Sequence, residues 1–242
     1  MSNVHYDKML IFQKCIQEYL KNIFQVYGME LELRLEELNL LDNKRNCLES
    51  STAIGFVLEE FIVSKLEMFT RCFEKGKGFL IKRREGPTAQ ASYDCYGTNE
   101  DIMIMINIKS SKGDENNNTA IASINRMVFD YVTTNPLQKK AFMVLKVSYD
   151  INLSKNPLTP HRKILINGIS SFYIDEIDFR TEHRQDHRSW SKNEANPNSG
   201  RLQVTESFRE KHRLEPDKIS YENTCNMLKN LVSRNGNGVT TE

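Results

Sequence analysis

Three polar side chains near the middle of the chain, Asp94, Asn107 and Lys109, have the types and spacing to bind a metal ion and a phosphate together. Asn107 and Lys109 come near the end of a long apolar segment, DIMIMINIKSS (101–111). Because side chains alternate across a strand, these two point to the same face. A lysine at the end of a buried strand is costly unless its ammonium faces a polar cavity. The sequence therefore predicts a polar pocket at this end of the strand.

A hairpin would bring Asp94 to the same pocket. SYDCY (92–96) is predicted to be a strand, GTNE (97–100) a turn and residues 101–111 the second strand. A carboxylate binds Mg²⁺ through oxygen, and the metal lowers the pKa of a bound water and stabilises charge on a phosphate. A lysine can position or help to deprotonate that water, and can neutralise developing charge. The pattern predicts phosphodiester hydrolysis, although a single Asp and Lys near a strand end are more often surface groups.

The order and spacing of these residues resemble the PD…(D/E)xK signature of the restriction-endonuclease superfamily, and in particular its type II restriction endonucleases. Tyr93 and Asp94 take the places of Pro and Asp, and the triplet from Asn107 to Lys109 takes the place of (D/E)xK. The resemblance spans about residues 50–210 and is one of motif order, not of extended identity. It implies that Asp94 binds metal, that Lys109 is catalytic, and that a glutamate on the preceding helix completes the site.

The chain departs from the signature at Asn107, which stands where the family has a second acid. An amide oxygen can bind Mg²⁺ but carries no charge, so another carboxylate has to compensate. The helix predicted from Ser51 to Phe73 offers Glu59 and Glu60. Helical spacing places Glu59 at the edge of the apolar stripe and Glu60 away from it, so we expect Glu59 to complete the metal site. If neither does, the protein would bind DNA without cleaving it.

DNA contacts need clustered cations for phosphates and polar side chains for base edges. Residues 75–84 form a basic stretch, which would otherwise be a solvated strand edge. The polar segment 180–201 is predicted to recognise sequence, with an ordinary mobile loop as the alternative. Some enzymes of the superfamily carry a glutamine in the loop before the metal-binding acid, which is the place of Gln90 here. The predicted DNA-binding residues are Thr88, Gln90, Ser110, Ser111, Lys112, Arg184, Arg188, Asn196, Asn198 and Arg201.

Helical and strand patterns alternate along the chain and predict an α/β fold, a restriction-endonuclease-like mixed β-sheet flanked by helices. Residues 1–48 are expected to form an N-terminal helical region and possible dimer interface, 49–234 the endonuclease domain, and 235–242 a disordered tail. Residues 29–41 are ambiguous, and we favour helix. The predicted helices are 5–27, 51–73, 119–132 and 219–233, and the further strands are 79–84, 140–149, 163–166, 171–177 and 201–208.

Composition narrows the class of protein. The 242 residues carry a net charge of +1, so any DNA-binding charge must be local. The five cysteines are scattered without CxxC spacing, which argues against a disulfide framework and fits a cytoplasmic protein with no membrane segment. We therefore expect a Mg²⁺-dependent type II restriction endonuclease that cleaves double-stranded DNA at a short specific site, as a homodimer. The alternatives are a repair or junction-resolving nuclease of the same superfamily, or a non-catalytic DNA-binding protein.

Overall fold

A computed structural model describes residues 3–33, 51–73, 79–85, 91–113, 118–132, 138–153, 162–181, 184–186 and 201–236. The first helix, α1 (Val4–Tyr27), is capped by Asn3, whose Oδ1 accepts a hydrogen bond from Tyr6 N at 3.2 Å. It ends at Gly28, whose φ of 79° is one that residues with a side chain rarely adopt. The predicted helix over 5–27 is confirmed.

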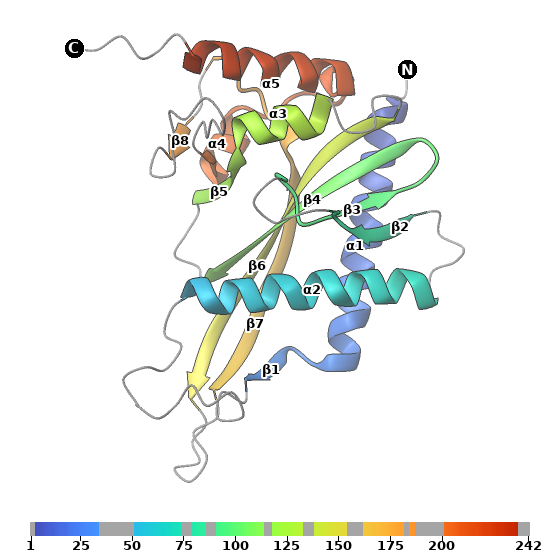
Figure 1. Ribbon diagram of the computed structural model, residues 1–242, viewed down its shortest axis with the longest axis vertical. Coiled ribbons are helices and arrows are strands. Elements are labelled where there is room, and N and C mark those ends of the chain that lie inside the picture. The colour runs from blue at the N-terminus through green and yellow to red at the C-terminus, as the bar shows by residue number, and fades with distance from the viewer. Residues whose placement is uncertain are drawn as a thin grey trace, which may run out of the picture.

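A six-stranded mixed sheet forms the centre of the molecule (Figure 1). Its central strands β4 and β6 are parallel, and all other neighbours are antiparallel. The predicted α/β class, a mixed sheet flanked by helices, is confirmed. Across the sheet the order is β1 (Glu30–Leu33), β7 (Arg162–Tyr173), β6 (Lys139–Leu153), β4 (Ile102–Lys112), β3 (Cys95–Thr98) and β2 (Leu80–Arg83).

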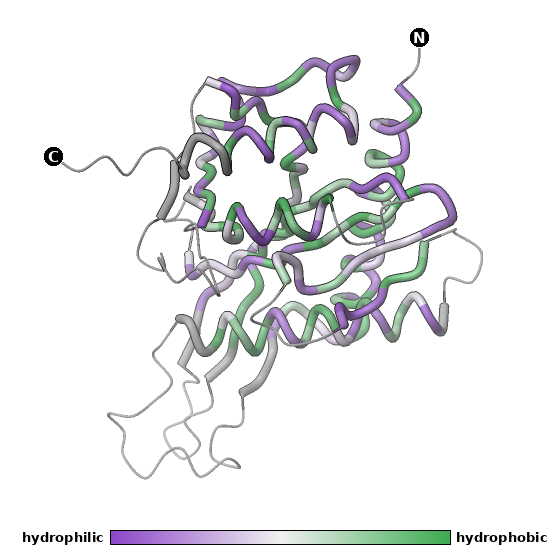
Figure 2. The backbone as a smooth tube through the Cα atoms, turned by 45° about the horizontal axis from the view of Figure 1, so that its top comes forward, coloured by the Kyte–Doolittle hydropathy of each residue, from purple (hydrophilic) through white to green (hydrophobic). Residues whose placement is uncertain are grey.

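Two hydrophobic cores lie on the two faces of this sheet. Helices α1 and α2 (Ser51–Phe73) pack on one face, where they bury Phe12, Leu58 and Ile104. On the other face, α3 (Ile124–Val132) and α5 (Tyr221–Gly236) bury Met105. Burial on both faces explains why β4 is apolar without alternation. Figure 2 shows hydrophobic residues along the central strands, whereas the helices alternate between hydrophobic and hydrophilic.

A second, three-stranded sheet lies beside α3, in the order β5 (Asn118–Ser123), β9 (Arg201–Thr205) and β8 (Arg184–Asp186). Its Ile121, Leu202 and Val204 belong to the same core as α3 and α5. After β9, Thr205 Oγ1 accepts a hydrogen bond from Phe208 N at 3.1 Å and so begins the short helix α4 (Glu206–Lys211). Short 3₁₀ turns at Ile174–Glu176 and Pro216–Lys218 complete the described elements.

Two of the predicted elements are wrong. The segment 29–41 was expected to be helical, but β1 pairs with β7, with Glu30 opposite Leu165. An alternation of apolar residues is typical of a strand, and residues 34–41 lie outside the described residues. The single helix predicted over 119–132 is a strand and a helix, because β5 finds a partner in β9 before α3 begins.

Other boundaries shift. The two strands predicted over 163–166 and 171–177 form one strand, β7. The strand predicted over 201–208 ends at Thr205, and the final helix continues to Gly236, into the tail that was predicted to be disordered. Residues 237–242 lie outside the described residues. Among the described helices, none is long and apolar enough to cross a membrane.

Candidate active site

The candidate site lies where β3 and β4 part. The two strands pair from Thr98 opposite Met103 to Cys95 opposite Ile106, and beyond that point no described strand covers this edge of β4. Asp94 N still donates to Ile106 O at 2.8 Å. The next hydrogen bond is made by its side chain in place of a backbone carbonyl, because Asp94 Oδ2 accepts from Ile108 N at 2.7 Å. The Asp94 carboxylate is therefore fixed at the open edge of the central strand.

Asn107 lies beside this carboxylate and is only 4% exposed. Its Nδ2 donates to Ser92 O at 2.9 Å, whereas its Oδ1 is buried and accepts no hydrogen bond from the described residues. A buried carbonyl oxygen without a donor costs about 1–3 kcal/mol. A cation bound at Oδ1 would remove that cost, so this orphan oxygen is the observation that best fits a metal ligand.

Helix α3 holds the segment before Asp94 from the other side. The Asp130 carboxylate accepts hydrogen bonds from Ser92 N at 2.6 Å and from Ser92 Oγ at 2.7 Å, and both residues are buried. Burial raises the pKa of Asp130, and the two bonds from Ser92 lower it. Since Ser92 O holds Asn107, Asp130 positions the site through Ser92. Sequence analysis missed this role, although an acid on the apolar face of the segment 124–132 is a signal of it.

Glu59 approaches the end of β4 from α2, on the face of the sheet opposite to Asn107 and Lys109. A Cβ added to Gly55 would lie 2.5 Å from Ser110 Oγ, so any larger residue would force this hydroxyl or the helix to shift. Glu59 lies one helical turn after Gly55, and its Oε1 accepts a hydrogen bond from Ser110 Oγ at 3.4 Å. Glu60, in contrast, forms an ion pair with Arg83 at 2.6 Å. Of the two glutamates considered from the sequence, Glu59 is the one that contacts β4.

The charges of the site act on one another. Burial raises the pKa of Glu59 above its ordinary value, the Lys109 ammonium lowers it and the Asp94 carboxylate raises it. Burial likewise raises the pKa of Asp94, which Lys109, the bond from Ile108 N and Arg84 lower. The structure therefore brings Glu59, Asp94 and Lys109 within electrostatic reach of one another, with Asn107 beside Asp94.

The ligand set is small but suits a hard cation. Among the described residues no group of three or more His, Cys, Asp or Glu side chains could hold a metal by itself. Asp94, Asn107 and Glu59 would supply two carboxylates and one amide oxygen. Mg²⁺ prefers oxygen ligands, keeps several of its waters and is usually held by only one or two carboxylates. The donor chemistry and the orphan Asn107 oxygen therefore fit Mg²⁺.

The predicted DNA-binding residues are distributed more widely. Ser110, Ser111 and Lys112 continue β4 past the site, and Lys112 is exposed. Arg184 and Arg201 begin β8 and β9 of the small sheet, at opposite ends of their pairing. The residues that lie outside the described part of the chain are Thr88, Gln90, Arg188, Asn196, Asn198, Lys75 and Lys77.

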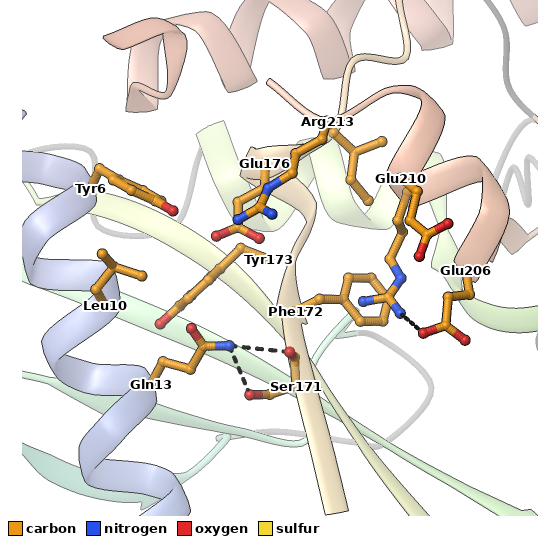
Figure 3. Close-up of a pocket in the computed structure, with 12 residues that line it drawn as sticks. Tyr6, Leu10, Gln13, Ser171, Phe172, Tyr173, Glu176, Glu206, Glu210 and Arg213 are labelled. Atoms are coloured by element: carbon orange, nitrogen blue, oxygen red, sulfur yellow. Dashed lines mark hydrogen bonds and ion pairs between the residues drawn. The ribbon is translucent and has the colours of Figure 1, made fainter. Parts of the chain in front are cut away.

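A separate pocket of about 330 Å³ lies between α1, β7 and α4 and contains no predicted site residue (Figure 3). Gln13 Nε2 donates to Ser171 Oγ at 3.0 Å, and Arg213 and Glu176 point toward each other. Burial raises the pKa of Glu176, and Arg213 lowers it. We assign Gln13, Ser171, Glu176 and Arg213 no role in the chemistry.

No known protein-family model matches the chain, and no curated protein matches its sequence. Function is therefore argued from the site itself.

Proposed function

We propose that the protein is a Mg²⁺-dependent endonuclease that hydrolyses phosphodiester bonds of double-stranded DNA at a short specific sequence, as a type II restriction endonuclease does. The observation that carries the proposal is the Asn107 Oδ1, a buried oxygen without a hydrogen-bond donor among the described residues, beside the fixed carboxylate of Asp94. The resemblance to the PD…(D/E)xK signature, stated from the sequence, gives the reaction class.

Each residue has a distinct role in the proposal. Asp94, Asn107 and Glu59 hold the ion through oxygen. When bound, Mg²⁺ supplies Lewis-acid stabilisation of the phosphate and a lowered pKa of the attacking water. Lys109 orients that water, helps to deprotonate it, or neutralises charge on the pentavalent transition state. The partial burial of the site strengthens these electrostatic interactions, because fewer waters screen them.

Two alternatives depend on specific features. A repair or junction-resolving nuclease would use the same residues, and a preference for branched over linear duplex DNA would identify it. A non-catalytic DNA-binding protein is motivated by the neutral Asn107. Titration with Mg²⁺ separates this alternative, because an intact site binds the ion and a dead one does not.

A homodimer in the cytoplasm belongs to the same proposal, since a two-fold protein matches a palindromic site. Helix α1 is the proposed interface. It packs on the sheet with one face, and its outer face exposes Ile11 (54%) and Val26 (77%). Next to it lies a mostly apolar hollow of about 560 Å³ that includes Leu20, Phe24 and Met29.

The test is to incubate the protein with phage DNA and Mg²⁺. We expect discrete fragments from the wild type and a loss of at least about 100-fold in rate for Asp94→Asn and for Lys109→Gln. Asp101→Asn and Lys139→Gln are matched controls. Asp101 lies in the turn of the same hairpin and pairs with Lys8 at 2.7 Å, and Lys139 lies at the far end of β6. Cleavage by the site variants at the rate of these controls would refute the mechanism.

A further inference from the structure

A second lysine stands directly beside Lys109. In the parallel pair of β4 and β6, Lys109 is in register with Lys146, and partners in such a pair point to the same face. Neighbouring strands lie about 4.8 Å apart, so the two side chains start as close neighbours. Both are half-buried on the central strands of the sheet. From the sequence alone, Lys146 is part of a predicted buried strand with no assigned role.

This arrangement is unfavourable in the free protein. Like charges directly opposite on neighbouring strands destabilise a sheet, and half-burial adds to the cost. No described carboxylate lies within ion-pair distance of Lys109 or Lys146. Burial lowers the pKa of Lys146, Arg209 lowers it further, and Glu206 raises it. Asp94 and Glu59 offset part of the charge of Lys109, and Glu206 offsets part of that of Lys146, but none of them forms an ion pair with either lysine. Two adjacent lysines without an ion-pair partner among the described residues form a local conflict of the kind expected where an anion binds.

Arg209 extends the positive charge along the same face. Its guanidinium lies 4.3 Å above the Phe172 ring, and Phe172 belongs to the core on the face of α3 and α5. One acid, Glu206, approaches Arg209, at 3.6 Å. Lys109, Lys146 and Arg209 thus form a row of three cations that crosses the sheet from β4 to α4.

The face that carries this row changes character at one position. Asn107, Val144 and Phe172 lie side by side across β4, β6 and β7, and up to their level this face is a buried core. Beyond the level of Asn107 its side chains are polar, whereas Ile108 and Val147 on the opposite face of the same strands are buried in the other core. Figure 1 shows this end of β4 between the start of α2 and β5. The polar strip consists of Lys109, Ser111, Lys146, Ser148 and Ser170.

We propose that Lys146 binds a phosphate of the nucleic-acid backbone next to the one attacked at Asp94 and Lys109, with Arg209 continuing the contact. Successive phosphates of one strand are farther apart than their axial rise of about 3.4 Å, and two long lysine side chains that start about 4.8 Å apart can diverge to reach both. The contact carries no sequence information, because it is made to the backbone. The choice of DNA as the ligand rests on the proposed function, whereas the anion site itself rests on the register and the charges.

The test is a salt titration of binding, read by fluorescence anisotropy of a labelled 30-base-pair duplex in EDTA between roughly 50 and 200 mM salt. Each lost phosphate contact reduces the slope of log affinity against log salt by about 0.9. We expect this loss for Lys146→Gln, so that wild-type affinity falls about threefold more than that of the variant over the range. Lys146→Arg keeps the wild-type slope, as does Lys139→Gln, which changes a lysine at the other end of the same strand that pairs with Glu222 at 3.7 Å.

A thermal melt of the same variants shows whether the fold is intact. Lys146→Gln should melt at a higher temperature than the wild type, because it removes one of two adjacent like charges, and Lys139→Gln should not. An unchanged salt slope in Lys146→Gln would overturn the inference and leave the proposed nuclease standing. A reduced slope in a protein that cleaves no DNA with Mg²⁺ would support the phosphate site and reject the nuclease. A wild type that binds no duplex at any salt concentration would overturn both.

Discussion

Asn107 is the residue on which the proposed metal site depends most. It replaces a charged ligand by a neutral one, yet its Oδ1 is buried without a donor among the described residues while its Nδ2 is held by Ser92 O. The hydrogen bond to Ser92 O orients the side chain, but it leaves Oδ1 without a partner among the described residues. In the proposed mechanism a cation would bind Oδ1, and Glu59, which accepts a hydrogen bond from Ser110, would supply the second negative charge from α2.

Asn107→Asp tests this interpretation through two opposed effects. The added charge should tighten Mg²⁺ binding, measured by isothermal titration calorimetry, by about tenfold. The same change removes the donor to Ser92 O and should lower the free energy of unfolding by about 1–3 kcal/mol. Asn99→Asp is the control, because Asn99 accepts from Asp101 N and Ile102 N through an oxygen that Asp also has. Weaker metal binding in Asn107→Asp would contradict the assignment of Asn107 as a ligand.

Asp94 gives a prediction on pH. Burial raises its pKa above the ordinary 3.8, so the folded protein holds a proton more tightly than the unfolded chain does. Stability contributed by this group is full below pH 3.8 and falls as the pH rises to its higher folded pKa. Asp94→Asn, whose amide oxygen can still accept from Ile108 N, should therefore unfold at higher urea concentration than the metal-free wild type at pH 7, and the gain should shrink toward pH 4.

The wild type, in turn, should lose Mg²⁺ affinity at a higher pH than an ordinary aspartate site, because protons compete for Asp94 and Glu59, both of whose pKa values are raised by burial. Urea denaturation and calorimetry across this pH range check both statements. A metal-free Asp94→Asn protein that is less stable than the wild type at pH 7 would show that the carboxylate is not strained in the way described.

At the scale of elements, helix α2 and helix α3 position the site from opposite faces of the sheet. Gly55 lets α2 approach Ser110 closely enough for Glu59 to reach β4, and Asp130 of α3 fixes Ser92. The hairpin alone carries Asp94, Asn107 and Lys109, but it does not bring the second carboxylate.

The substitution Gly55→Ala should distinguish the effect of the position of Glu59 on cleavage from the effect of the mutation on the stability of the fold. The added methyl would lie 2.5 Å from Ser110 Oγ, so it would displace either the Ser110 hydroxyl, which donates to Glu59, or the helix α2 itself. Overpacking costs about 1–3 kcal/mol, and better helix propensity returns about 1 kcal/mol, so the net loss should be small. Displacing Glu59 by about 1 Å should nevertheless reduce cleavage about 100-fold.

Gly97→Ala is the matched control for this prediction. Its Cβ would lie 2.3 Å from the Phe12 ring, far along the same hairpin, so it should destabilise the protein without a comparable loss of activity in the remaining folded fraction. Urea curves and cleavage rates measured on the same samples give the activity per folded molecule. Equal values for the two variants would show that α2 does not position a residue needed for cleavage.

At the same scale, the sequence predicted local elements better than their pairing. The helices α1 and α2 follow from periodicity over many residues, and the strand β4 from its apolar run. The segment 118–123 joined β9, about 80 residues away in the chain, and no local pattern reveals such a partner. For the site, the alternation of β4 was enough to place Asn107 and Lys109 on one face. The hydrogen bonds from Ser92 to Asp130 depend on how α3 packs on the sheet, and the pairing of Lys109 with Lys146 depends on the register of β4 and β6. The sequence alone gives neither.

At the scale of the whole molecule, the site lies at the boundary between a buried core and a polar strip on one face of a single sheet. The N-terminal helix belongs to the same hydrophobic core as α2 and the central strands, and β1 pairs with β7 at the edge of the same sheet. The proposed dimer would therefore present two complete sites, each built within one chain. Such an arrangement suits two cuts in the two strands of a palindromic duplex.

The most direct test of the whole account is to locate the metal. Crystals of the wild type with Mn²⁺ in place of Mg²⁺ can be measured at a wavelength where manganese scatters anomalously. We predict one peak within about 2–2.3 Å of an Asp94 carboxylate oxygen and of Asn107 Oδ1, with Glu59 bound directly or through water. A peak elsewhere, or none at this edge of β4 in a protein that binds manganese in solution, would contradict the central claim.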